Sequence, residues 1–197
     1  DQGVVCFDTG ICALRGGWVG GFLRLSPARF GFVQGPRIAG DLAFTSPNGS
    51  AWLGASARYS GLHLHGKRVV LEYTVGDVRV FESPWLETRG DLNVFARSLE
   101  LAPGSSELTL ALAAGSATIT GPTSTRAVVR RDKGVLAVAV LGSDVRLAKE
   151  SPGLTAVFPP RTGARSVKVL FWSGHEAPLP KFDAFANAAG EHENLAA

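Results

Sequence analysis

Residues 61–84 read GLHLHGKRVVLEYTVGDVRVFESP, and this stretch decides the fold class. Apolar and polar side chains alternate along it, and a glycine opens each of two tight turns, Gly66-Lys67 and Gly76-Asp77. Glycine at the first central position suits the type II′ turn that joins antiparallel strands. The stretch therefore predicts a three-stranded antiparallel meander.

The two turns also predict which residues face each other across the strands. The expected opposite pairs are His65 with Arg68, His63 with Val70, Val75 with Val78, and Tyr73 with Val80. This register gathers the large apolar side chains on one face of the meander, which we expect to be buried. The members of this face are Leu62, Leu64, Val69, Leu71, Tyr73, Val75, Val78 and Val80.

The same pattern recurs along the rest of the 197-residue chain. Its 24 glycines and 11 prolines separate short runs rich in Val, Leu, Ala and Thr. Runs at 99–101 and 108–112 flank a turn at 103–106, and runs at 126–130 and 135–140 flank a turn at 132–134; two more follow at 154–158 and 167–172. Repeated strands at this spacing predict an all-β fold, an antiparallel β-sandwich of two sheets.

We expect residues 1–178 to form the sandwich domain and residues 179–197 to form a short helix and tail. Phe182, Phe185, Ala186 and Ala189 recur at helical spacing, and Gly190 stands where a helix would stop. Within the sandwich, prolines and glycines make 26–58 the least regular region. Such a loop either binds a ligand or covers a sheet.

Composition excludes several classes of protein. Hydrophobic residues make up 45% of the chain and charged residues 19%, so the chain has enough apolar surface to fold. No apolar run reaches the roughly 18 residues of a membrane-spanning helix, so we expect no membrane span. The net charge is only +3, and Arg130, Arg131 and Lys133 form the one tight basic cluster, so we expect no nucleic-acid partner.

The start of the chain suggests processing. The sequence contains no methionine and begins with no signal peptide, so we interpret the chain as a processed or excised piece of a longer precursor.

The two cysteines, Cys6 and Cys12, flank the residues FDTGI. A tight hairpin through 8–10 would let them form a cross-strand disulfide, which an oxidising compartment favours. Two buried reduced thiols are the alternative. The chain has no C-x-x-C-H motif, so it cannot attach a c-type haem in the usual way, and we expect no cofactor in this chain.

The histidines of the meander form a candidate metal site. Strand alternation points His63 and His65 to the same face, and Glu72 lies diagonally from His63 on that face. The fixed cation of Arg68 opposite His65 would repel a metal ion and favours two surface histidines instead.

Three tryptophans, Trp18, Trp52 and Trp85, stand in loop-like surroundings and are candidate ligand-binding residues. Exposed indole rings stack on sugars or anchor partner domains. The alternative is that they are buried and close the ends of the sandwich.

A glycosidase would need two convergent carboxylates, and no sequence spacing selects a pair here. The candidates are Asp8, Asp41, Glu72, Glu82 and Glu87. The chain also lacks the G-x-S-x-G, P-loop and dinucleotide-binding motifs. We therefore expect no catalysis by the chain alone, with a glycosidase or metal enzyme as the alternative.

Several segments resemble a known family in the same order along the chain. They are CFDT at 6–9, WVGGFL at 18–23, YSGLHLHGKRVVLEYTVG at 59–76, FARSLELAP at 95–103, FWSG at 171–174 and LPKF at 179–182. They are similar to a β-rich domain of unknown function in large secreted proteins of planctomycetes and verrucomicrobia. There the domain accompanies a c-type cytochrome module and often a propeller-like module.

The resemblance implies context rather than catalytic residues. It implies an exported protein, periplasmic or secreted, whose partners are haem-bearing or propeller-like modules. From it we expect a non-catalytic β-sandwich domain of a haem-c-associated oxidoreductase that docks redox modules or holds a carbohydrate-like substrate. The alternative is a free-standing carbohydrate-binding module that uses its loop tryptophans.

Overall fold

The computed structural model describes residues 3–27, 35–120, 124–151, 153–189 and 195. Within these residues, antiparallel strands build almost the whole fold and one short helix follows them. The predicted all-β class with a C-terminal helix is confirmed.

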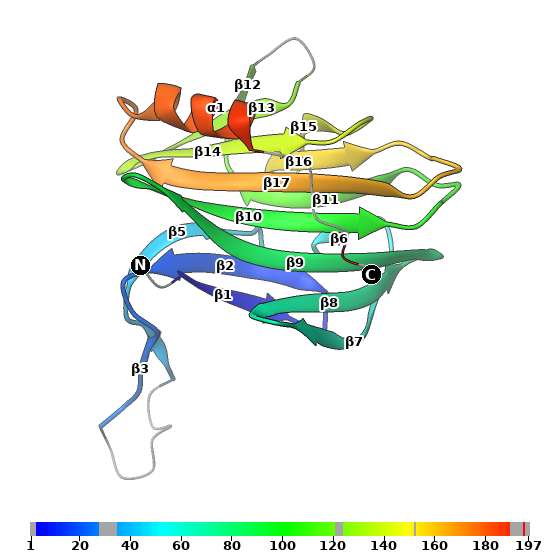
Figure 1. Ribbon diagram of the computed structural model, residues 1–197, viewed down its shortest axis with the longest axis horizontal. Helices are drawn as coiled ribbons and strands as arrows, with labels where there is room; N and C mark the ends of the chain where they lie inside the picture. Colours follow the sequence, from blue (N-terminus) through cyan, green and yellow to red (C-terminus); the bar gives the residue numbers. More distant parts are fainter. Residues whose placement is uncertain (1–2, 28–34, 121–123, 152, 190–194, 196–197) are drawn as a thin grey trace.

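One large sheet runs through the whole molecule (Figure 1). Its eight strands lie in the order β12-β13-β14-β17-β10-β9-β8-β7. In chain order the strands are β7 (Ala57–His65), β8 (Arg68–Val75), β9 (Val78–Arg89), β10 (Leu92–Leu101), β12 (Ala117–Thr120), β13 (Arg126–Arg131), β14 (Gly134–Leu141) and β17 (Arg165–Gly174).

Two smaller sheets form the second layer, and together they cover one face of the large sheet. The three-stranded sheet has the order β1-β2-β5, and the four-stranded sheet has the order β15-β16-β11-β6. Their strands are β1 (Gly3–Asp8), β2 (Ala13–Val19), β5 (Asp41–Thr45), β6 (Trp52–Leu53), β11 (Leu108–Ala114), β15 (Arg146–Glu150) and β16 (Gly153–Phe158). The short pair β3 (Leu23–Arg24) and β4 (Arg37–Ile38) projects away from both layers (Figure 1).

Aromatic side chains fill the core between the layers. Phe44 of β5 stacks on Phe171 of β17 with ring centroids 4.5 Å apart, and it meets Phe95 of β10 edge-on at 5.5 Å. The ring centroids of Trp52 in β6 and Tyr73 in β8 are 6.4 Å apart. Because these rings come from both layers, their burial holds the layers together.

The helix α1 (Leu179–Ala188) covers part of the other face of the large sheet. Its buried residues are Phe182, Phe185 and Ala186, as the helical spacing predicted, and the Phe182 ring stacks on Trp172 at 6.1 Å. The predicted stop at Gly190 lies outside the described residues.

The predicted meander register is confirmed at all four pairs: His65 lies opposite Arg68, His63 opposite Val70, Val75 opposite Val78, and Tyr73 opposite Val80. Gly66 and Gly76 have φ values of 60° and 59°, a conformation that side chains with a Cβ rarely adopt. This backbone conformation therefore favours glycine at both turns.

The apolar face of the meander is only partly buried, so the prediction for this face is wrong in its outer half. Residues 71–80 of this face are 6% exposed or less. Leu62, Leu64 and Val69 are 54%, 75% and 37% exposed. The covering sheet ends at β1, so nothing in the described chain lies over this end of β7 and β8.

The expected hairpin between 99–101 and 108–112 does not form. The first run belongs to β10 of the large sheet and the second to β11 of the four-stranded sheet. Backbone hydrogen bonds between Gly104 and Arg161, of 3.0 and 2.9 Å, hold the connection as it crosses between layers. Both leucine runs therefore face the core from opposite layers, whereas β13 and β14 do form the predicted hairpin.

Region 26–58 is more regular than its prolines predicted. It contains β4, β5 and β6, and β5 pairs with β2. Phe44 and Trp52 from this region are buried in the core, so the region covers the sheet, as one of the two interpretations held. Its residues 28–34 lie outside the described ranges.

A charged network lies buried on the inner face of three adjacent strands. Arg97 of β10 donates from Nε to Glu82 Oε1 at 2.6 Å and from Nη2 to Glu82 Oε2 at 2.9 Å, and the Tyr73 hydroxyl donates to Glu82 Oε2 at 2.6 Å. All three side chains are 1% exposed or less. Burial disfavours the Arg97 cation, but the Glu82 carboxylate outweighs it and raises the pKa of Arg97 above its ordinary value.

We expect Arg97→Met to destabilise the protein by about 3–5 kcal/mol, because it leaves the Glu82 carboxylate buried without its cation. Urea unfolding measures this change in free energy. The control is Arg146→Met, at an exposed arginine, which should change stability by about 0.5 kcal/mol or less. Equal losses in the two variants would contradict the structural role of the network.

Candidate functional site

The two layers end at different places on one side of the molecule. β7 is the last strand of the large sheet, and β1 is the last strand of the three-stranded sheet that covers it. Leu62, Leu64 and Val69 lie on the inner face of the large sheet, beyond the cover that β1 provides. An apolar face that should pack against a second layer is thus left open at this edge.

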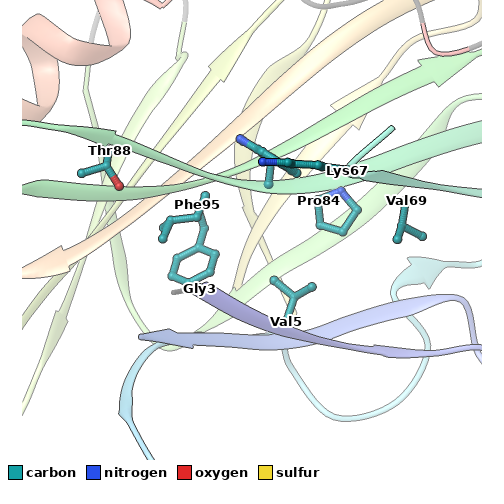
Figure 2. A pocket seen from close by; sticks show the side chains of 9 residues that line it. Gly3, Val5, Lys67, Val69, Pro84, Thr88 and Phe95 are labelled. Carbon is teal, nitrogen blue, oxygen red and sulfur yellow. The ribbon is translucent and has the colours of Figure 1, made fainter. Parts of the chain in front are cut away.

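A cavity of about 350 Å³ lies between β1 and the strands β8 and β9. Figure 2 shows Val69, Pro84 and Phe95 of the large sheet on one side and Gly3 and Val5 of β1 on the other. Val69 belongs both to the cavity wall and to the exposed apolar face. We call this cavity, with the neighbouring exposed leucines Leu62 and Leu64, the edge cleft.

The rim of the edge cleft carries positive charge. Lys67, in the turn between β7 and β8, is exposed and lines the cavity. The guanidinium carbon of the next residue, Arg68, lies 4.7 Å from the centroid of the Trp85 ring, and alternation along β8 and β9 places both of these side chains on the outer face of the large sheet. The edge cleft therefore combines apolar walls with a cationic end, a composition typical of a binding site.

The candidate metal residues lie on the opposite, outer face of the meander. His63 Nε2 is 2.8 Å from Glu72 Oε2, and the His63 ring meets Phe81 edge-on at 6.3 Å. Arg68 faces His65 in the register. The described residues hold no group of three or more His, Cys, Asp or Glu side chains that could bind a metal ion. The structure therefore pairs His63 with Glu72 and leaves His65 beside a cation.

The three candidate tryptophans lie in different surroundings. Trp18 is 5% exposed and donates from Nε1 to the carbonyls of Gly21 and Phe22 at 2.9 Å, while Trp52 is 1% exposed in the core. These two have no open ring face for a sugar, so their interpretation as exposed stacking residues is wrong. Trp85 alone of the three is partly exposed.

The candidate carboxylates lie on different parts of the fold. Glu82 is held by Arg97 in the core, Glu87 pairs with Lys168 at 3.0 Å and Glu72 pairs with His63 on the outer face. The two aspartates are also apart, since Asp8 Oδ1 accepts from the turn amide of Gly10 at 2.9 Å and Asp41 lies at the start of β5. The structure does not assemble a glycosidase pair from these residues.

The two cysteines are not bonded to each other. Cys6 is exposed and lies opposite Gly16, while Cys12 is buried in the turn before β2. The disulfide, which the sequence left open beside two reduced thiols, does not form in this structure, because the turn between β1 and β2 includes Cys12 itself. Burial, together with the nearby carboxylates of Glu82 and Asp8, raises the pKa of the Cys12 thiol from 9.0 to about 11.

We expect a thiol reagent to modify Cys6 quickly and Cys12 slowly in the folded protein, because only Cys6 is exposed. Mass spectrometry without reductant measures one fast adduct, and a second adduct should appear on unfolding. A protein that gives no adduct before reduction would instead contain the disulfide.

We also expect stability to fall between pH 9 and 11. In this range the unfolded chain releases the Cys12 proton while the folded chain keeps it, so rising pH favours unfolding. Chemical unfolding at several pH values measures the slope. Cys12→Ala should reduce the slope and Cys6→Ala should not; equal slopes in all three proteins would contradict the assignment.

The structure places at the edge cleft residues that the sequence did not assign to any functional site. Val5 and Val69 line the edge cleft, and Leu62 and Leu64 are exposed beside it. The alternation of the sequence predicted that Leu62, Leu64 and Val69 would be buried in the core. One available signal was the composition of β1, GVVCFD, which has no positive charge and no proline along an edge.

The fold and the edge cleft define a class: a two-layer antiparallel β domain with an open apolar edge. Among the described residues, no helix is long and apolar enough to cross a membrane. Residues 5–82 match the family model of a domain of unknown function, DUF6797. The match runs from β1 into β9 and contains the segments at 6–9, 18–23 and 59–76 that carried the resemblance. Neither the curated proteins nor the solved structures gave a match.

Proposed function

We propose that this chain is a non-catalytic β-sandwich domain that docks a neighbouring protein module through the edge cleft. The observation that carries the proposal is the exposure of Leu62, Leu64 and Val69 beside a cavity of about 350 Å³. A contiguous apolar surface of this kind costs free energy in water and marks an interaction site. Covering it with a partner removes that cost.

The arrangement of the polar side chains supports docking over catalysis. A catalytic site brings acid, base or nucleophile together in one pocket. Glu72 instead contacts the His63 ring, Glu87 forms a partly buried ion pair with Lys168, and Glu82 forms a buried ion pair with Arg97. The walls of the edge cleft are apolar, and its charged rim residue is a lysine.

The proposed partner follows from the resemblance described above. It is a haem-bearing or propeller-like module of an exported, haem-c-associated oxidoreductase, in the periplasm or outside the cell. The chain supplies the docking surface, and haem c belongs to the partner. The matched domain of unknown function includes the cleft leucines, so the docking surface lies within the part of the chain that the family model covers.

Holding a carbohydrate-like substrate is the alternative role, and it would depend on Trp85. Trp85 is one of the residues around the cavity and is partly exposed, but its ring is in contact with Arg68 on the outer face of the sheet. A sugar would have to share or displace this contact.

We expect the protein purified without denaturation from its native source to carry a haem-containing partner, seen as a Soret absorption band and a second chain by intact mass. Leu62→Thr/Leu64→Thr should lose the partner, because it removes exposed apolar surface while keeping residues that favour strands. Leu25→Thr is the matched control, since Leu25 is 61% exposed and does not line the edge cleft. A colourless, single species from the unaltered protein would contradict the proposal.

Oligosaccharide titration separates docking from carbohydrate binding. We expect tryptophan fluorescence to stay unchanged across a panel of oligosaccharides, because Trp18 and Trp52 are buried. A saturable change that Trp85→Ala abolishes would instead identify a carbohydrate-binding module.

A further inference from the structure

We infer that the edge cleft receives one extended strand of a partner polypeptide, which pairs with β1 and carries an acidic residue beside Lys67. This inference rests on the proposed docking function and adds the form and chemistry of the docked segment. It follows from the free edge of β1, the width of the uncovered face and the charge at the rim.

The edge of β1 is suited to pairing with another strand. On one side β1 pairs with β2, and on the other side no described strand pairs with it. Strands at sheet edges usually carry charges or proline that prevent pairing with other chains. The edge strand β15, RLAKE, has three charged residues, whereas β1, GVVCFD, has a single aspartate at its end.

A strand added to β1 would also cover the exposed apolar face. Paired strands lie about 4.8 Å apart and packed sheets about 10 Å apart. Because β1 lies against β9, a strand next to β1 would lie over β8, where Val69 is exposed, with Leu62 and Leu64 of β7 at its outer side. Every second side chain of the added strand would point into the edge cleft, so these positions should be apolar.

The same geometry excludes a second copy of this chain paired through β1. In such a dimer, each large sheet would extend past its own β1 toward the other copy. In each copy β7 extends beyond β1, so the two β7 strands would occupy the same space next to the paired β1 strands. One strand without a large sheet behind it avoids this overlap.

The charge of Lys67 indicates which type of residue should stand at one end of the added strand. Lys67 is exposed and lines the cavity together with Gly3 and Val5, near the first residues of β1. No carboxylate among the described residues forms an ion pair with Lys67 in the structure. An acidic residue at this end of the added strand would meet Lys67.

The experiment selects the strand from a displayed library of random peptides of about nine residues, with the full chain as bait. Binders should alternate apolar and polar positions and carry aspartate or glutamate at one end. The absence of enrichment, or binders without alternation, would overturn the inference.

An N-methyl scan of a selected peptide tests the backbone pairing. Only every second residue of a paired strand directs its N–H toward its neighbour. Methylation should therefore weaken binding by about tenfold or more at alternate positions and little between them. Hydrogen exchange of the β1 amides should slow when the peptide binds. Uniform effects along the peptide, or protection confined to other strands, would overturn strand addition.

Matched variants locate the peptide. Leu62→Thr/Leu64→Thr should weaken binding at least about tenfold, while Leu25→Thr should not. Lys67→Gln should abolish the preference for an acidic end, while Lys133→Gln, in the exposed turn after β13, should keep it. Unweakened binding to Leu62→Thr/Leu64→Thr, or an acidic preference that Lys67→Gln retains, would overturn the site.

The outcomes separate this inference from the proposed function. Peptide binding on β1 without a haem-containing partner would retain the strand site and reject the redox context. A haem-containing partner whose contact leaves the β1 amides exchanging freely would retain docking and reject strand addition. A small amphiphile such as decanoate that fills the cavity without slowing the β1 amides would identify a ligand pocket and also reject strand addition.

Discussion

The structure depends on covering the two apolar faces of one eight-stranded sheet. The central strands β10, β14 and β17 carry large apolar residues on both faces, so neither face can be left to water. Two small sheets cover the inner face, and α1 covers part of the outer face. The helix is short, but its two phenylalanines are enough to pack against Trp172 and its neighbours.

The inner face of the large sheet is not covered in the same way along its whole width. Where β8, β9 and β10 lie under the second layer, the core contains a carboxylate, a guanidinium and a phenol, because Glu82, Arg97 and Tyr73 satisfy one another's hydrogen bonds. A buried ion pair adds little net stability, but each partner becomes costly without the other. The network therefore favours one register of β8, β9 and β10, the register in which these three side chains meet.

Farther along β8 the cover ends, and the same face becomes a surface. Tyr73 is fully buried, whereas Val69, two inward positions earlier on the same strand, is 37% exposed. Local sequence does not mark this change, since both residues are large and apolar. The edge of β1 marks it, and this edge belongs to a different sheet. The proposed docking surface is thus a continuation of the inner apolar face that forms the core under the second layer.

Sequence by itself determined the all-β class, the two-residue turns at Gly66 and Gly76, the register of the meander and the helix that begins at Leu179, since these depend on contacts between near neighbours and on backbone limits. Tertiary structure alone decided that β10 and β11 enter different sheets, that Cys6 and Cys12 remain apart, and that Leu62 and Leu64 meet water. Alternation shows that side chains share a face. Whether another layer lies over that face depends on residues distant in the chain, which periodicity does not encode.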